Sequence, residues 1–252
     1  MFEPVITAFR TLTILPVPGR ESKNPASALP FFPVVGAAIS MLLYGIAWGA
    51  GHLFPQYPLL GALVCVTVVI VLSGALHLDG FADIADAFGG GTTRERTLAI
   101  LKDSRHGTFG VTTIVLDITA KIILYAWCID YHHFELPALS VAFSRTVQAW
   151  GCSLFPYAIP EGGGTSAFFT GSKRIPLAVA SVVLLAAAYR FAGETAAVVI
   201  TFAAILPVVL FYGVSNGRIG GLTGDCLGAA NEIGELALLV TGVLFYTIIV
   251  VI

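Results

Sequence analysis

The sequence predicts an all-α, polytopic helical integral membrane protein with about seven transmembrane helices and a cytoplasmic N-terminus. Of its 252 residues, 57% are hydrophobic and only 11% are charged, whereas an ordinary soluble domain is about 25% charged. Several apolar runs are about 18 to 24 residues long, which is enough to cross a bilayer as a helix. The short alternating segments of a transmembrane barrel are not seen. We therefore expect one membrane-embedded domain over residues 1–252.

Seven apolar ranges account for the predicted spans in chain order. The first is interrupted by Pro33 and several glycines, which membrane helices tolerate better than soluble ones. The second is the most uniformly apolar. The fourth contains Arg145 and Gln148, so we expect it to face the interior of the bundle. The predicted spans are 30–53, 58–76, 111–130, 137–158, 176–192, 195–213 and 235–252.

Basic residues indicate the orientation, because cytoplasmic loops carry an excess of Lys and Arg. With the N-terminus in the cytoplasm, only Arg190 falls on an outside loop. The inside segments hold Arg10, Arg20, Lys23, Arg94, Arg96, Lys102, Arg105, Lys173, Arg174 and Arg218. The net charge of -2 gives no indication of a nucleic-acid partner. The main acidic stretches fall on the basic side, so we expect the chemistry to face the cytoplasm.

The stretch LHLDGFADIADAF, residues 76–88, places three carboxylates beside an apolar run. Asp79, Asp83 and Asp86 are spaced i, i+4 and i+7, which puts them on one face of a helix. Like charges at this spacing repel, and a bridging cation removes the repulsion. Magnesium suits such a site, since it prefers oxygen ligands and shares them with substrate phosphates. Gly80 leaves room beside Asp79 for a ligand. The alternative is a solvated polar face at the membrane edge.

A second acidic stretch, residues 217–235, follows a glycine-rich turn. Asp225 and Glu232 are seven residues apart and complete the predicted set of metal ligands. The turn supplies Gly221, Thr223 and Gly224, and the backbone amides of such a turn can hold phosphate. We expect this stretch to lie in a cytoplasmic segment ahead of the last span. The alternative is a flexible turn that leads into that span.

Between these stretches lies LKDSRHGTFGV, residues 101–111. Lys102 and Arg105 are candidates to bind phosphate or to balance developing negative charge. The other predicted site residues here, an acid, a hydroxyl and two positions of open backbone, are Asp103, Ser104, Gly107 and Gly110. The alternative is a basic anchor at the membrane edge.

Charges within the predicted spans form a further group. Ionisable groups inside a membrane are costly and are functional by default. Asp117 and Lys121 are four residues apart and can neutralise each other. Lys121 and Arg145 are therefore predicted either to pair with acids or to bind substrate.

Together these patterns favour metal-assisted chemistry on a phosphorylated substrate. No serine–histidine arrangement indicates hydrolysis through a nucleophile. The residues predicted to be catalytic are Asp79, Asp83, Asp86, Lys102, Asp103 and Arg105. The residues alone do not identify the substrate.

The runs HLDGFADIADAF, KDSRHGTFG and GGLTGDCLGAANEIGE, in this order, resemble the cobalamin synthase (adenosylcobinamide-GDP ribazoletransferase) family. The resemblance implies a magnesium-dependent integral enzyme of a bacterial or archaeal inner membrane. Such an enzyme joins adenosylcobinamide-GDP to alpha-ribazole, or to alpha-ribazole 5'-phosphate, and releases GMP during assembly of the nucleotide loop of coenzyme B12. Homo-oligomers and complexes with other B12-assembly enzymes stay open.

The family pattern includes every carboxylate of the three motifs, with His106 standing where the family usually has an aliphatic residue. The nearest enzyme alternative is a CDP-alcohol phosphotransferase-like protein, whose Asp-Gly-x-x-Ala-Arg pattern is incomplete here, since Asp83 follows Ala82. An ion-coupled transporter is the alternative from another class. It would place its acids near the middle of the bilayer.

Overall fold

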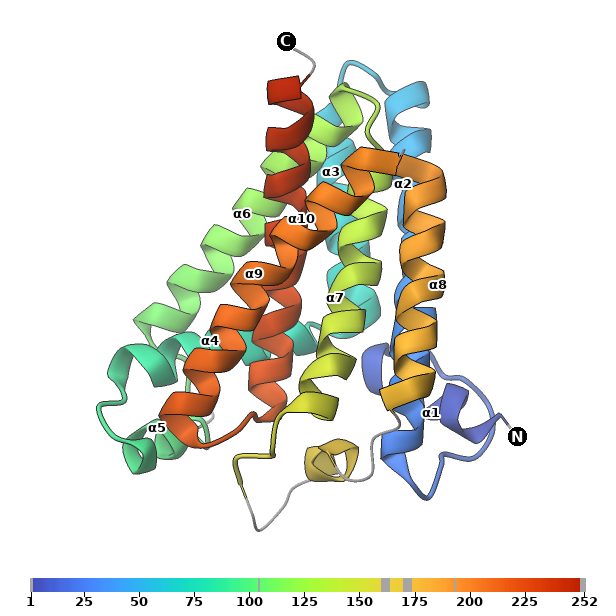
Figure 1. The fold of residues 1–252 in the computed structure, drawn as a ribbon. Helices are drawn as coiled ribbons and strands as arrows, with labels where there is room; N and C mark the ends of the chain where they lie inside the picture. The colour runs from blue at the N-terminus through green and yellow to red at the C-terminus, as the bar shows by residue number, and fades with distance from the viewer. Residues whose placement is uncertain (1, 104, 160–163, 170–173, 193, 250–252) are drawn as a thin grey trace.

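The computed structural model describes residues 2–103, 105–159, 164–169, 174–192 and 194–249, and these form a bundle of helices (Figure 1). The α-helices are α1 (Glu3–Leu12), α2 (Phe32–Leu53), α3 (Pro58–Ser73), α4 (Leu76–Gly90), α5 (Arg94–Ile100), α6 (Thr108–Asp130), α7 (Glu135–Leu154), α8 (Arg174–Ala192), α9 (Glu194–Ile219) and α10 (Gly224–Ile249). The described residues also include two 3-10 helices, η1 (Pro25–Phe31) and η2 (Gly164–Phe169). Within the described residues there is no strand, only an isolated bridge between Tyr157 and Leu222.

Among the described residues, four helical segments are long and apolar enough to cross a membrane. They are Pro25–Leu53, Thr108–Asp130, Val198–Ile219 and Gly224–Ile248, and α3 with α4 would make a fifth if that bent pair were a single span. The all-helical prediction is confirmed, but the count of about seven spans is not. Large apolar side chains such as Met41, Leu116 and Phe202 are exposed on the outer helices, as expected for surfaces that meet lipid.

The fourth predicted span, 137–158, corresponds to α7, which packs between α2 and α10 and also contacts α8. Most of its residues are buried, including Arg145 and Gln148. Because other helices cover α7 on several sides, its polar side chains do not have to face lipid. Its low average hydropathy is therefore compatible with the interior position that Arg145 and Gln148 had suggested.

The chain turns sharply between α3 and α4, whose axes differ by 87°. Gly74 and Ala75 both adopt left-handed conformations, with φ of 60° and 58°. Their amides bond back to the carbonyl oxygens of Val71 and Ile70, which closes the end of α3 in the manner of a Schellman motif. As a result α4 runs across the bundle beside α5 and α6 rather than continuing α3 (Figure 1).

The last helix corrects one prediction. It begins at Gly224, well before the expected start near residue 235. The stretch that carries Asp225 and Glu232 is therefore the start of α10 and packs within the bundle, rather than forming a separate segment ahead of that helix. Hydropathy failed to detect this because polar residues at 225, 231, 232 and 235 lower the average, while the fold buries the last three of them.

Candidate functional site

Helices α4 and α10 cross at unusually short range. A Cβ atom built on Gly80 would lie 2.9 Å from the Cα atom of Asp225, and one built on Gly228 would lie 3.1 Å from the carbonyl oxygen of His77. Real Cβ atoms rarely come this close to backbone, so only glycine fits at this crossing. The close approach brings Asp79 and Asp83 of α4 beside Asp225 of α10, although the two groups are far apart in sequence.

The carboxylates at this crossing influence one another. Burial, followed by the negative charges of Asp79 and Asp225, raises the pKa of Asp83 to about 6. The Asp83 side chain is 22% exposed, against 62% for that of Asp79. Mutual repulsion of this kind, at a partly open surface, is what a bound cation relieves.

His106, which sequence reasoning noted only as a departure from the family pattern, lies beside two of these acids. Its Nε2 atom is 3.7 Å from Asp79 Oδ1, and its Nδ1 atom is 3.5 Å from Asp83 Oδ1. The imidazole therefore covers the same face of α4 as the predicted metal ligands. No spacing rule links residue 106 to residues 79 and 83, so only the fold reveals this contact.

Asp86, the third acid of the predicted face, has partners from the backbone. Its two oxygens accept hydrogen bonds from the amides of Gly107 (2.6 Å) and Gly110 (2.9 Å) at the start of α6. A Cβ atom on either glycine would collide with the Asp86 carboxylate. Glycine at both positions leaves room for the Asp86 carboxylate, which caps the N-terminus of α6 although it belongs to α4.

Replacing Asp86 with alanine is expected to lower the thermal unfolding midpoint, because it leaves the start of α6 without its acceptor. Loss of an N-terminal cap typically costs about 1–2 kcal/mol. Asp103→Ala is the matched control, since Asp103 is an exposed acid on the adjoining loop and exposed ion pairs contribute little. Unchanged stability with lost turnover in Asp86→Ala would instead support the role of metal ligand that the sequence suggests.

The basic loop before α6 is exposed. Arg105 pairs with Asp103 through Nη2 at 2.6 Å and Nε at 2.9 Å, and this hydrogen bonding lowers the pKa of Asp103 to about 2. Lys102 is also exposed. Ser104, predicted to bind substrate, lies outside the described residues. The loop thus offers basic groups next to His106. They lie beside the crossing of α4 and α10 that carries Asp79, Asp83 and Asp225, which we call the acidic crossing.

The glycine-rich turn before α10 is shaped by a backbone pairing. Leu222 donates to the carbonyl of Pro156 (2.9 Å) and accepts from the amide of Ala158 (2.9 Å). Gly221 passes so close to Pro156 that a Cβ atom would lie 2.5 Å from its carbonyl oxygen. Thr223 then accepts a hydrogen bond from the amide of Cys226 (3.3 Å) at the first turn of α10. Gly224 opens α10, whose first turn carries Asp225 against Gly80 of α4.

Two arginines that sequence reasoning did not single out hold this turn in place. Arg94 donates to the carbonyls of Ile219 (2.8 Å) and Ala158 (3.0 Å). Arg218 donates to the carbonyls of Phe88 (2.9 Å) and Gly91 (2.8 Å) at the end of α4. The positive-inside pattern had explained both only as orientation signals.

The remaining predicted residues lie deeper, in a buried ionic cluster that we define as Asp117, Lys121, Arg145, Glu232 and Glu235. Lys121 pairs with Glu232, with Glu235 (2.9 Å) and with Asp117 (3.2 Å). Arg145 pairs with Glu235. All five side chains are at least nine-tenths buried. Glu232, predicted as a metal ligand, pairs with Lys121 here, and Arg145 pairs with Glu235. Both cations that were predicted to bind substrate therefore have acidic partners within the protein.

The acidic crossing fits magnesium by its donor chemistry. Among the residues that the structure describes, no three His, Cys, Asp or Glu side chains already converge as a metal site. Magnesium, however, commonly takes only one or two carboxylates and completes its shell with water and substrate phosphates. Asp79, Asp83 and Asp225 offer such oxygens at a partly exposed surface.

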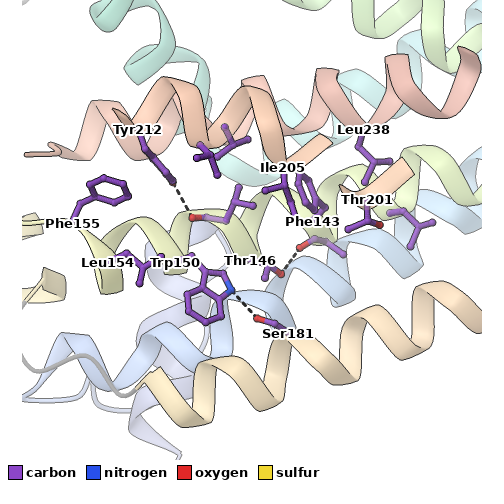
Figure 2. Close-up of a pocket in the computed structure, with 15 residues that line it drawn as sticks. Phe143, Thr146, Trp150, Leu154, Phe155, Ser181, Thr201, Ile205, Tyr212 and Leu238 are labelled. Carbon is purple, nitrogen blue, oxygen red and sulfur yellow. Dashed lines mark hydrogen bonds between the residues drawn. The ribbon is translucent and has the colours of Figure 1, made fainter. Parts of the chain in front are cut away.

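An apolar cavity among the described residues lies away from this crossing. It has a volume of about 390 Å³ and lies among α7, α8, α9 and α10, with Phe143, Trp150 and Tyr212 in its lining (Figure 2). The indole of Trp150 donates to Ser181 (3.1 Å), and the Tyr212 hydroxyl donates to the Val147 carbonyl (2.9 Å). Its main polar groups therefore have partners within the protein, and no carboxylate lines it. This cavity lacks the chemistry for phosphoryl transfer.

Comparisons with known proteins agree over almost the whole chain. The family described as Cobalamin-5-phosphate synthase matches residues 4–243. A protein of Chlorobium phaeovibrioides named adenosylcobinamide-GDP ribazoletransferase is 37% identical, over 97% of this chain and 99% of its own length. A protein of the same name from Sinorhizobium medicae is 32% identical, over 94% of this chain and 95% of its own. No solved structure gives a significant match.

Proposed function

The chain belongs to the cobalamin-5-phosphate synthase family, and we propose that it joins adenosylcobinamide-GDP to alpha-ribazole, or to alpha-ribazole 5'-phosphate, releasing GMP. Family membership makes it a transferase of cobalamin biosynthesis. The single observation that carries the assignment to a site is the crossing of α4 and α10, where Gly80 lies against Asp225. It gathers acids from two separate motifs at one partly open surface.

The proposed reaction is a phosphoryl transfer. The hydroxyl of the ribazole attacks the phosphorus attached to the cobinamide arm, a new phosphorus–oxygen bond forms, and the bond to GMP breaks. Asp79, Asp83 and Asp225 would hold magnesium, which when bound neutralises phosphate charge and stabilises the leaving GMP. A carboxylate of this group orients the attacking hydroxyl and accepts its proton. Lys102 and Arg105 would bind phosphate oxygens.

We further propose that the site faces the cytoplasm from an inner membrane that the chain crosses about seven times. This proposal rests on the distribution of basic residues. Helices α1 and α5, the start of α8 and the end of α9 lie at the same end of the bundle as α4 (Figure 1). Arg10, Arg94, Arg174 and Arg218 belong to these segments.

The test is a reconstitution assay. The purified chain in liposomes is incubated with adenosylcobinamide-GDP and alpha-ribazole, with and without magnesium, and both products are followed by chromatography. We expect GMP and the corrin product in equal amounts, and neither after magnesium is chelated. No product from folded protein, under conditions where a relative is active, would overturn the proposal. CDP-alcohol substrates, and then ion transport, would be tested next.

A further inference from the structure

The buried ionic cluster draws its members from three helices and contacts a fourth, α4. Asp117 and Lys121 come from α6, Arg145 from α7, and Glu232 and Glu235 from α10. Arg145 also donates through Nη2 to His77 Nδ1 of α4 at 3.5 Å. His77 lies two residues before Asp79 and is 1% exposed. The cluster therefore reaches both helices that carry the proposed metal ligands.

Within this cluster Glu235 is the best-connected acid. It pairs with Arg145 and with Lys121, and its Oε1 atom also lies near Ser144 (3.3 Å) and Asn231 (3.1 Å). These contacts hold Arg145 in one orientation, with its Nη2 atom directed at His77. A buried arginine held by an acid is a rigid donor, because its planar guanidinium has little freedom.

We propose that Arg145, held by Glu235, is a positioning residue for the reaction and acts through His77. This inference rests on the proposed function. Because α4 follows a sharp bend, its first turn depends on contacts with the bundle to keep Asp79 and Asp83 opposite Asp225. Gly228 against His77 and Gly80 against Asp225 provide the backbone contacts. The Arg145–His77 hydrogen bond depends on direction, unlike these backbone contacts, so it sets the rotation of α4 about its own axis. This role explains why the chain keeps a fully buried arginine that substrate does not reach.

The primary test is Arg145→Gln in the full chain, reconstituted in liposomes. We expect kcat to fall about 10- to 100-fold, since a misplacement of roughly 1 Å distant from the chemistry can cost about 100-fold. The KM for adenosylcobinamide-GDP should stay unchanged, because Arg145 does not touch substrate. The magnesium concentration for half-maximal rate should rise, as expected when groups that orient metal ligands are lost.

Hydrogen exchange supplies a readout that does not depend on activity. In Arg145→Gln, amides of residues 76–83 should exchange faster than in the wild type, because the first turn of α4 loses its anchor. Gln148→Met is the matched control. Gln148 is 3% exposed and links α7 to α10 through the carbonyl of Leu227 at 3.1 Å, and this hydrogen bond goes to α10 rather than to α4. Its loss should leave both exchange in α4 and kcat unchanged.

Two substitutions at His77 test the Arg145–His77 contact while the ion pair between Arg145 and Glu235 stays intact. His77→Asn keeps a polar acceptor near the position of Nδ1 and should retain most of the rate, whereas His77→Leu should lower kcat as Arg145→Gln does. The proposal is overturned if exchange in α4 is unchanged in Arg145→Gln, or if His77→Leu is as active as His77→Asn. Absence of transferase activity in the wild type would overturn the proposed function instead, and the exchange data would still decide whether Arg145 anchors α4.

Discussion

Asp83→Asn is expected to reduce turnover by at least about a thousandfold while the protein still folds and inserts. A bound metal stabilises the charge of the transition state by several kcal/mol, and each 1.4 kcal/mol corresponds to roughly tenfold in rate. Burial, followed by the negative charges of Asp79 and Asp225, raises the pKa of Asp83. Asparagine has nearly the same shape but removes the negative charge that would hold magnesium. GMP release in liposomes and the thermal unfolding midpoint measure the two effects separately.

Glu95→Gln is the matched control for this change. Glu95 is an exposed acid of α5 at the same end of the bundle, so the loss of its charge should leave turnover unchanged. If Asp83→Asn were to keep wild-type turnover, the three-acid site would be wrong. The reaction would then have to be sought at Asp103 or within the buried ionic cluster.

Gly80→Ala is the change with the next-largest expected effect. The added methyl group would lie 2.9 Å from the Cα atom and 3.0 Å from the carbonyl oxygen of Asp225. Backbone cannot swing aside as a flexible side chain does, so α4 and α10 must separate. Overpacking of this kind costs about 1–3 kcal/mol, and a shift of roughly 1 Å between reacting groups costs up to about 100-fold in rate. We expect a lower unfolding midpoint and about 100-fold slower release of GMP.

Gly45→Ala controls for the change of residue type. Gly45 also lies within a helix, but a Cβ atom there would meet nothing within 4 Å. Alanine favours helix by about 1 kcal/mol over glycine, so Gly45→Ala should match or exceed wild-type stability at full activity. Equal behaviour of the two variants would show that the crossing of α4 and α10 is not tight in the working enzyme.

Much of the fold was predictable from the sequence, because in a membrane the apolar length of a segment indicates where a helix lies. The predicted range 58–76 corresponds to α3, and 111–130 corresponds to most of α6. The spacing of Asp79, Asp83 and Asp86 correctly indicated a helix, which is α4. The start of α10 was missed, since buried acids with cationic partners resemble a polar loop when only hydropathy is considered.

The candidate site was predictable in its residue types and only partly in its arrangement. Carboxylate spacing reports which side chains share a helix face, but not what lies opposite that face. Asp86 is opposed by the amides at the start of α6. Lys121 and Arg145 meet acids of α10. Local pattern contains no information on such partners, because they come from segments many residues away.

The sequence by itself determined the class of molecule, the helical face of three aspartates and, through its motifs, the family. Those properties depend on composition and on periodicities within single segments. Only the tertiary structure decided that Asp225 joins Asp79 and Asp83, that His106 stands beside them, and that Glu232 and Glu235 neutralise Lys121 and Arg145. Close packing at Gly80 and Gly228 brings α4 against α10 and so sets the first of these arrangements. The need of buried charges for opposite partners sets the last.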